Sequence, residues 1–132
     1  MNPNKLFPLI VTDDLDQSRT YYAEVLGFEV SMEMPGYVQF RVGADPAGPE
    51  LAIMTPNPDA GHTAFGGHGL IVSIPTPNAD ETHTRYQAAG AHMLSQPSDK
   101  PWGWRSFALR DPNGVVLDFF HVQRDGVADA PG

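Results

Sequence analysis

The strongest constraint on the fold is a turn signature that occurs twice, each time at the same distance from a preceding proline. The stretch Asp45-Pro46-Ala47-Gly48 begins ten positions after Pro35, and Asp111-Pro112-Asn113-Gly114 begins ten positions after Pro101. Proline presets φ at the first corner of a turn, and the glycine accepts conformations that other residues avoid. An apolar run follows each turn. A duplicated structural module is the simplest explanation of this repeat.

Each half of the chain predicts a strand, a helix and then further strands, which makes the fold class α+β. Asp14 and Asn78 are predicted helix N-caps, each with Gln or Glu three residues later, and Gly27 and Gly90 are predicted to end the two helices. The predicted strands are residues 6–12, 28–34, 37–42 and 50–55 in the first half, and 69–74, 106–110 and 115–121 in the second. The predicted organisation is a first βαβββ module at 1–56, a linker at 57–67, a second module at 68–123 and a flexible tail at 124–132.

Composition narrows the range of functions. The chain has 132 residues, of which 41% are hydrophobic, so it is expected to form one domain of two halves. Cysteine is absent, which removes disulfides, thiolate metal sites and thiol nucleophiles and fits a cytoplasmic protein. The N-terminal residues do not resemble a secretory signal, and no apolar run is long enough for a membrane span. The net charge of −8 argues against a nucleic-acid partner.

Two segments resemble the vicinal oxygen chelate superfamily, which contains glyoxalase I, the extradiol dioxygenases and the bleomycin-resistance proteins. They are VTDDLDQSRTYYAEVLGF in the first half and PWGWRSFALRDPNGVVLDFF in the second, and the resemblance spans about residues 5 to 122. It implies two βαβββ modules whose curved mixed sheets surround a cavity, with the helices outside, and usually a homodimer. The fold hosts metal enzymes and metal-free binders alike, so it does not by itself define an activity.

The metal enzymes of this superfamily place their ligands on the first and last strands of each module. The corresponding positions in this sequence are expected to be Phe7, Ala52, Ile71 and Asp118. Asp118 is the one residue among them that can bind a metal, and a single carboxylate does not hold a divalent ion well. His121 lies three residues after Asp118, and this odd spacing places the two on opposite faces of a strand. We therefore expect no metal and no other cofactor.

Two tryptophans, Trp102 and Trp104, flank Gly103 just before a predicted strand. Metal-free members of the superfamily use aromatic residues near this point to stack on planar ligands, which implies a ligand-binding role for both. The alternative for Trp102 is that it packs the turn after Pro101. Trp104 departs from the glutamine that is common after this glycine in the superfamily, which leaves the direction of its side chain open.

Asp118 stands among apolar neighbours on the last strand, which leaves two interpretations. Its carboxylate either meets a cationic or donor group of a ligand, or pairs with Arg105, Arg110 or a backbone donor within the protein. Strand parity places Phe120 on the same face. The predicted ligand contacts form an apolar, aromatic-lined pocket with one acid, and they are Phe7, Leu9, Phe40, Trp102, Trp104, Asp118 and Phe120.

The favoured hypothesis is a metal-free small-molecule binder similar to the bleomycin-resistance proteins. It would sequester a planar or amphipathic ligand, with cationic and aromatic compounds as candidates, and would confer resistance to an antibiotic without bond chemistry. A metal-dependent lyase or dioxygenase with displaced ligands is the first alternative, because the superfamily contains both. The second is a degenerate member with a filled pocket and an interaction role.

Overall fold

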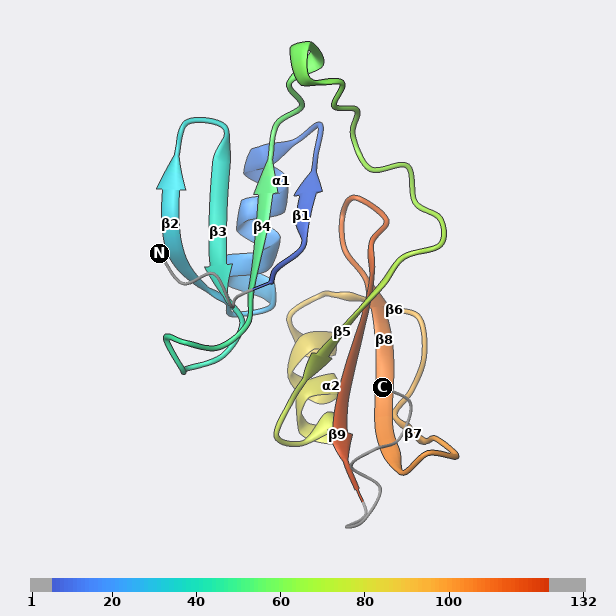
Figure 1. Cartoon of the computed structure of the whole chain (residues 1–132). Coiled ribbons are helices and arrows are strands. Elements are labelled where there is room, and N and C mark those ends of the chain that lie inside the picture. Colours follow the sequence, from blue (N-terminus) through green and yellow to red (C-terminus); the bar gives the residue numbers. More distant parts are fainter. Residues whose placement is uncertain (1–5, 124–132) are drawn as a thin grey trace. The chain divides into compact units, whose positions relative to one another are not determined.

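The computed structural model describes residues 6–123, which form two compact units (Figure 1). Unit 1 comprises residues 6–67 together with the turn 112–114, and unit 2 comprises residues 68–111 and 115–123. Each unit contains one mixed β-sheet, which confirms the predicted α+β class and its βαβββ modules. No helix among the described residues is long and apolar enough to cross a membrane. The predicted tail at 124–132 lies outside the described residues.

Unit 1 has the sheet order β1-β4-β3-β2, in which β1 and β4 are parallel and the other pairs are antiparallel. Its elements are β1 (Leu9–Val11), α1 (Leu15–Thr20), the π-helical turn η1 (Tyr21–Val25), β2 (Glu29–Met34), β3 (Tyr37–Arg41), β4 (Glu50–Met54) and the 3-10 turn η2 (Pro58–Ala60). The first strand is shorter than predicted, because Pro8 has no backbone N–H to donate to a ladder. The η2 turn within the predicted linker was not expected.

Unit 2 repeats this arrangement with the sheet order β5-β9-β8-β6, and β7 also pairs with β8. Its elements are β5 (Ile71–Pro75), α2 (Ala79–Ala88), β6 (His92–Met93), β7 (Ser98–Asp99), β8 (Trp104–Arg110) and β9 (Val116–Val122). The strand that follows the helix is divided into β6 and β7, each of which has two residues. Pro97 lies between them and interrupts the ladder because it lacks a backbone donor.

Both helices begin and end where the sequence predicts. The Oδ1 atom of Asp14 accepts a hydrogen bond from the backbone N–H of Gln17 at 3.0 Å, and Oδ1 of Asn78 accepts one from Glu81 at 3.1 Å. Gly27 and Gly90 follow the helices with φ of 76° and 93°, a conformation that is easiest for glycine. The wide π turn at the end of the first helix was not predicted, because no sequence pattern signals it.

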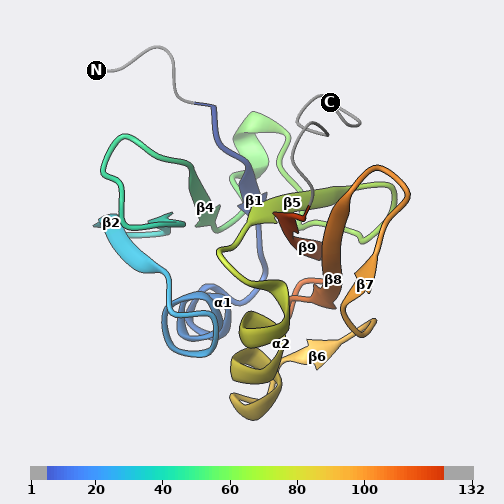
Figure 2. The same cartoon turned by 90° about the horizontal axis from the view of Figure 1, so that it is seen from below.

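Each helix covers one face of the sheet in its own unit and leaves the other face open. In unit 2, Tyr86 and His83 of α2 pack edge-on against Phe119 and Phe107, with ring centroids 5.2 and 5.1 Å apart. Figure 2 shows α2 lying along one side of this sheet. In unit 1, Tyr22 packs on Phe40 at 5.6 Å. The opposite face of each sheet is not covered by a helix of its own unit, and some of its side chains, such as Leu9, are exposed.

The second turn signature, whose residues 112–114 belong to unit 1, makes a buried polar contact within that unit. Oδ1 of Asn113 accepts a hydrogen bond from the Thr12 hydroxyl at 2.6 Å, and its Nδ2 donates to the Ser18 hydroxyl at 3.0 Å. Thr12 and Ser18 are 1% and 0% exposed, so Asn113 satisfies polar groups that water does not reach. The corresponding residue of the first turn signature, Ala47, is exposed and has no such role.

Replacing Asn113 with alanine should therefore destabilise the protein. The Asn113→Ala variant leaves the Thr12 and Ser18 hydroxyls without this partner, which should lower the free energy of unfolding by about 1–3 kcal/mol. Urea denaturation, monitored by circular dichroism, measures this free energy of unfolding. The matched control is Ala47→Asn at the equivalent exposed position, where we expect a change within about 0.5 kcal/mol. Equal effects of the two variants would contradict a structural role for Asn113.

Candidate functional site: the open face of unit 2

The register of the sheet in unit 2 defines what its open face presents. Asp118 on β9 pairs with Ser73 on β5 and with Ala108 on β8. Phe120, two residues further along β9, pairs with Pro75 and Ser106. Side chains of directly paired residues lie on the same face of a sheet. Because Leu117 and Phe119 point into the core, Asp118 and Phe120 occupy the face that α2 does not cover.

Three aromatic side chains gather at one end of this face. The rings of Trp104 and Phe120 are stacked, with centroids 3.9 Å apart and planes inclined by 9°. Trp102 meets Trp104 edge-on at 6.2 Å and is 38% exposed. In this stack, one face of the Trp104 ring is covered by Phe120, and one face of the Phe120 ring is covered by Trp104. A planar ligand would therefore stack on the outer face of either ring rather than between the two. Trp102 packs against Trp104 and is also open to solvent, so its role in ligand binding stays a prediction.

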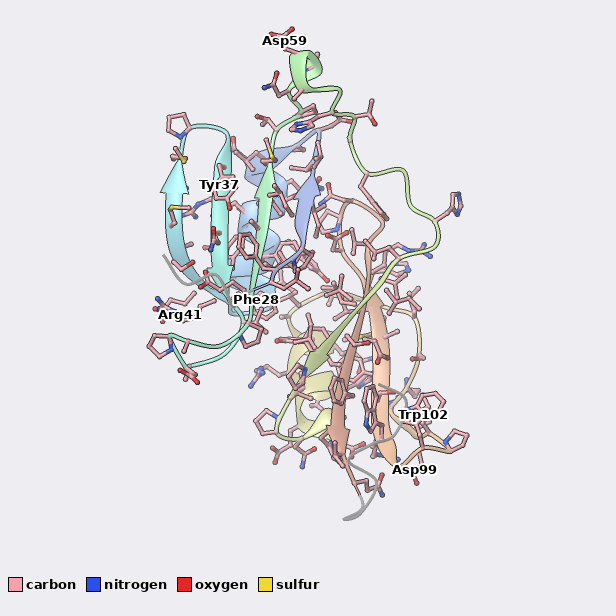
Figure 3. All side chains as sticks on the ribbon, in the orientation of Figure 1. Phe28, Tyr37, Arg41, Asp59, Asp99 and Trp102 are labelled. Carbon is pink, nitrogen blue, oxygen red and sulfur yellow. The ribbon has the colours of Figure 1, made fainter. Side chains whose placement is uncertain are left out.

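A hollow of about 300 Å³ adjoins this cluster at the loop between β7 and β8. Backbone hydrogen bonds fix the loop, from Lys100 N–H to the Trp104 carbonyl at 2.7 Å and from Gly103 N–H to the Lys100 carbonyl at 3.0 Å. Figure 3 shows Trp102 and Asp99 near each other at this end of unit 2. The hollow is lined by Asp99, Lys100, Pro101, Gly103, Trp104 and Gln123. Its volume is in the range of small-ligand sites.

Asp118 is half-buried, and burial raises the pKa of its carboxyl above the ordinary value. The charge of Lys100 and a hydrogen bond from the Ser106 side chain oppose this effect and favour the ionised form.

Arg105, one of the partners of Asp118 considered from the sequence, forms ion pairs with other acids. Its guanidinium contacts the carboxylates of Asp80 and Asp99, each at 2.9 Å. Arg105 pairs with His121 in the register, which places it on the face opposite Asp118.

The predicted contacts from the first module lie in unit 1 and do not all share one face of its sheet. Leu9 is 46% exposed and lies on the open face of its sheet, beside Ala52. Phe7 is partly exposed and precedes β1. Phe40 is fully buried against Tyr22 on the helix-covered face, so its expected position on a pocket wall requires correction. Its neighbours along β3, Gln39 and Arg41, are the residues that face outward, because strand parity alternates the two sides.

The register also corrects the expected metal-ligand positions on the first strand of each module. Leu9, not Phe7, pairs with Ala52, and Ser73, not Ile71, pairs with Asp118. Leucine, alanine and serine do not make the donor set that a divalent ion requires. No group of three His, Asp or Glu side chains with metal-binding geometry occurs within residues 6–123. The residues present therefore do not fit the metal centre of the catalytic members.

His121 lies on the face opposite Asp118, as strand parity predicts. Its Nδ1 accepts a hydrogen bond from the backbone N–H of Ala79 at 2.8 Å, at the first turn of α2. That acceptor satisfies one of the N–H groups that a helix leaves without an internal partner. His121 therefore has a structural role in unit 2.

Sequence reasoning missed a polar cluster on the open face of unit 1. Glu50 is 8% exposed, and its Oε1 accepts hydrogen bonds from Ser31 at 2.6 Å and Gln39 at 2.8 Å. Tyr37 donates to Gln39 at 2.7 Å, and burial together with the charge of Glu50 raises the pKa of Tyr37. The available signal was that Glu50 lies two residues before Ala52, which places both on one face.

Lys100 was also missed, because nothing in the sequence places it beside Trp104.

Replacing Asp118 with asparagine should stabilise unit 2 near neutral pH. A carboxyl whose pKa is raised on folding contributes stability below the ordinary pKa of 3.8, and this contribution is lost as the pH rises through the folded-state value. Asparagine does not ionise. The unfolding free energy of Asp118→Asn should therefore rise relative to the unmodified protein between about pH 3 and pH 7, as urea denaturation would measure.

The control for this measurement is Asp80→Asn, for which the opposite sign is expected. Hydrogen bonding to Arg105 lowers the pKa of Asp80, so its carboxylate contributes stability above the ordinary pKa, and this contribution is lost as the pH falls. Asp80→Asn should therefore lose stability relative to the unmodified protein as the pH approaches neutrality. The same pH trend for both variants would contradict the difference in environment between the two carboxyls.

Solved structures share this fold across nearly the whole chain. A glyoxalase/bleomycin resistance protein/dioxygenase from Nocardioides is 26% identical, with a TM-score of 0.76 and coverage of 96% of this chain and 87% of that one. TioX from Micromonospora sp. ML1 is 23% identical, with a TM-score of 0.74 and coverage of 90% and 98%. A glyoxalase/bleomycin resistance protein/dioxygenase family enzyme from Burkholderia phytofirmans PsJN is 19% identical, with a TM-score of 0.69 and coverage of 88% of this chain and 96% of that one. The last two likenesses show the fold alone.

The sequence itself identifies the family. No curated protein matches the chain. The family model described as the glyoxalase/bleomycin resistance protein/dioxygenase superfamily matches residues 6–119, which includes both turn signatures and every strand except the end of β9. That range exceeds half of the chain, and the two βαβββ modules have the architecture that the sequence resemblance implied. The chain therefore belongs to the glyoxalase/bleomycin resistance protein/dioxygenase superfamily.

Proposed function

We propose that this chain is a small-molecule-binding member of the superfamily, which sequesters a planar or amphipathic ligand without a metal. The observation that carries the proposal is the open face of unit 2, where Trp104 stacks on Phe120 and Asp118 lies on the same side of the sheet. Aromatic rings provide a large rigid contact area, and one carboxylate provides direction. Binding in this arrangement requires no chemical reaction of the ligand.

The energetics of Asp118 support a contact with a ligand. A half-buried carboxylate has lost part of its hydration, and its pKa is raised because the protein only partly replaces that hydration. A ligand that donates a hydrogen bond or carries a positive charge would supply the missing interaction. Ligands of this kind are therefore favoured over purely apolar ones. The ring system of the ligand would lie on the outer surfaces of the Trp104 and Phe120 pair.

The metal-dependent alternative can be tested directly. The residues paired at the expected ligand positions are Leu9 with Ala52 and Ser73 with Asp118, a set that contains a single carboxylate. Elemental analysis of protein purified without added metal or chelator addresses the question independently of any assay. We expect no stoichiometric zinc, nickel, iron or manganese. One such ion per chain would support a lyase or dioxygenase with displaced ligands.

The assembly that we propose follows from the superfamily resemblance, and the location follows from the absence of cysteine. We expect a homodimer located in the cytoplasm, with no nucleic-acid or membrane partner. The absence of cysteine and the net charge of −8 are compatible with this proposal. Light scattering coupled to size-exclusion chromatography would measure the mass of the assembly against that of one chain.

Replacing Trp104 should weaken the binding of a planar ligand more than replacing Trp102. We expect Trp104→Leu to raise the dissociation constant of 2-naphthylmethylammonium by about tenfold, because it removes the stacking surface. The matched control, Trp102→Leu, removes an indole of the same size that lies edge-on to the cluster, and should have a smaller effect. Ligand-detected NMR titration measures both. Equal dissociation constants for the unmodified protein and Trp104→Leu would overturn the proposed binding face.

A further inference from the structure

We propose that Lys100 binds an anionic group of the ligand, so that the ligand class is a planar compound with an anionic substituent near a hydrogen-bond donor. This inference rests on the proposed function and specifies the chemistry of that site. It is argued from the position of Lys100 in the lining of the hollow, from its fixed relation to Trp104, and from the fact that no acid within residues 6–123 forms an ion pair with it.

The loop that precedes β8 holds Lys100 beside the aromatic cluster. The Lys100 N–H donates to the Trp104 carbonyl at 2.7 Å, and the Lys100 carbonyl accepts from Gly103 at 3.0 Å. Gly103 has φ of 93°, which closes the turn with a conformation that a side chain would disfavour. The Gln123 N–H donates to the Gly103 carbonyl at 2.8 Å and ties the loop to the end of β9. Lys100 is therefore positioned by backbone contacts on both sides.

Two of the described acids near the loop pair with Arg105 and not with Lys100. Asp99, the adjacent residue, contacts Nη1 of Arg105 at 2.9 Å, and Asp80 contacts Nε of the same guanidinium. Among the described residues, the side chain of Lys100 makes its one hydrogen bond to the Ser98 hydroxyl, at 2.6 Å. An ammonium carries three donors, so two remain for a ligand. A carboxylate or similar anion that enters the hollow would meet them.

Asp118 raises a rival explanation for Lys100. The charge of Lys100 lowers the pKa of Asp118, so the two groups interact, although no ion pair within 4.0 Å joins them. If Lys100 only screened this acid, an anionic ligand would gain nothing from it. If it binds the ligand, an anionic group should pair with Lys100 and a cationic or donor group with Asp118. The two explanations predict different responses to the charge of the ligand.

Three naphthalene probes of similar size separate these explanations: 2-naphthoate, 2-naphthylmethylammonium and the neutral 2-naphthylmethanol. Ligand-detected NMR titration gives each dissociation constant. We expect naphthoate to bind about fivefold more tightly than the neutral probe, as for a partly exposed ion pair. Lys100→Gln should remove that advantage, so that naphthoate and the neutral probe bind the variant with similar dissociation constants. Asp118→Asn should remove the advantage of the cationic probe and should not weaken naphthoate binding.

The control variant is Arg85→Gln, which changes the net charge by the same amount. Arg85 lies over the ring of Tyr86 on α2, the helix that covers the other face of the sheet. This variant should leave the preference for naphthoate within about twofold of that of the unmodified protein, because distant exposed charges are screened by salt. An equal loss of preference in both variants would mean that net charge, not Lys100, attracts the anion, and would overturn the inference.

Failure of this inference differs from failure of the proposed function. If 2-naphthylmethanol binds but naphthoate binds no more tightly, or if Lys100→Gln leaves their ratio unchanged, the assignment of Lys100 is overturned while the binding face remains. If none of the three probes binds the unmodified protein, both the binding face and the role of Lys100 are overturned. Retention of the naphthoate preference in Lys100→Arg would support pairing through charge.

Discussion

The pairing of β8 with β9 is the constraint on which the candidate site depends. A strand presents alternate residues to opposite faces, so a shift of one residue would move Asp118 into the core and Phe119 out of it. The turn between the strands prevents that shift. Oδ1 of buried Asp111 accepts a hydrogen bond from Val115 N–H at 2.8 Å, and Asp111 N–H donates to the Val115 carbonyl at 2.9 Å. The turn residues thereby determine which side chains reach the open face.

The two open faces each carry one acid on the last strand of the module, but the two acids differ in burial and in hydrogen bonding. Glu50 in unit 1 is nearly buried and accepts hydrogen bonds from Ser31 and Gln39. Asp118 in unit 2 is half-buried, and burial outweighs the favourable effects of Lys100 and Ser106 on its charge. Hydrogen bonds hold Glu50 within the protein, whereas the hydrogen bond from Ser106 and the charge of Lys100 only partly compensate Asp118 for its burial. This contrast favours unit 2 as the binding face.

Much of the fold could be predicted from the sequence, because local signals were strong and agreed with one another. Asp14 and Asn78 cap helices, Gly27 and Gly90 end them, and the repeated turn signature predicted two similar modules. Phe40 was placed incorrectly because aromatic residues fit a core and a pocket equally well, and burial depends on which face the helix covers. The first-strand register was off by two residues, since sequence spacing does not define the partner across a parallel pair.

The double contact of Arg105 has a consequence for the mobility of the site. Its guanidinium connects Asp80, in the first turn of α2, with Asp99, the residue immediately before Lys100. The helix and the binding loop are therefore coupled through charges that lie partly in solvent. Salt weakens attraction of this kind, so a higher ionic strength should loosen the connection between the loop and the helix. The site would be most rigid in dilute buffer and would sample more conformations where ions are abundant.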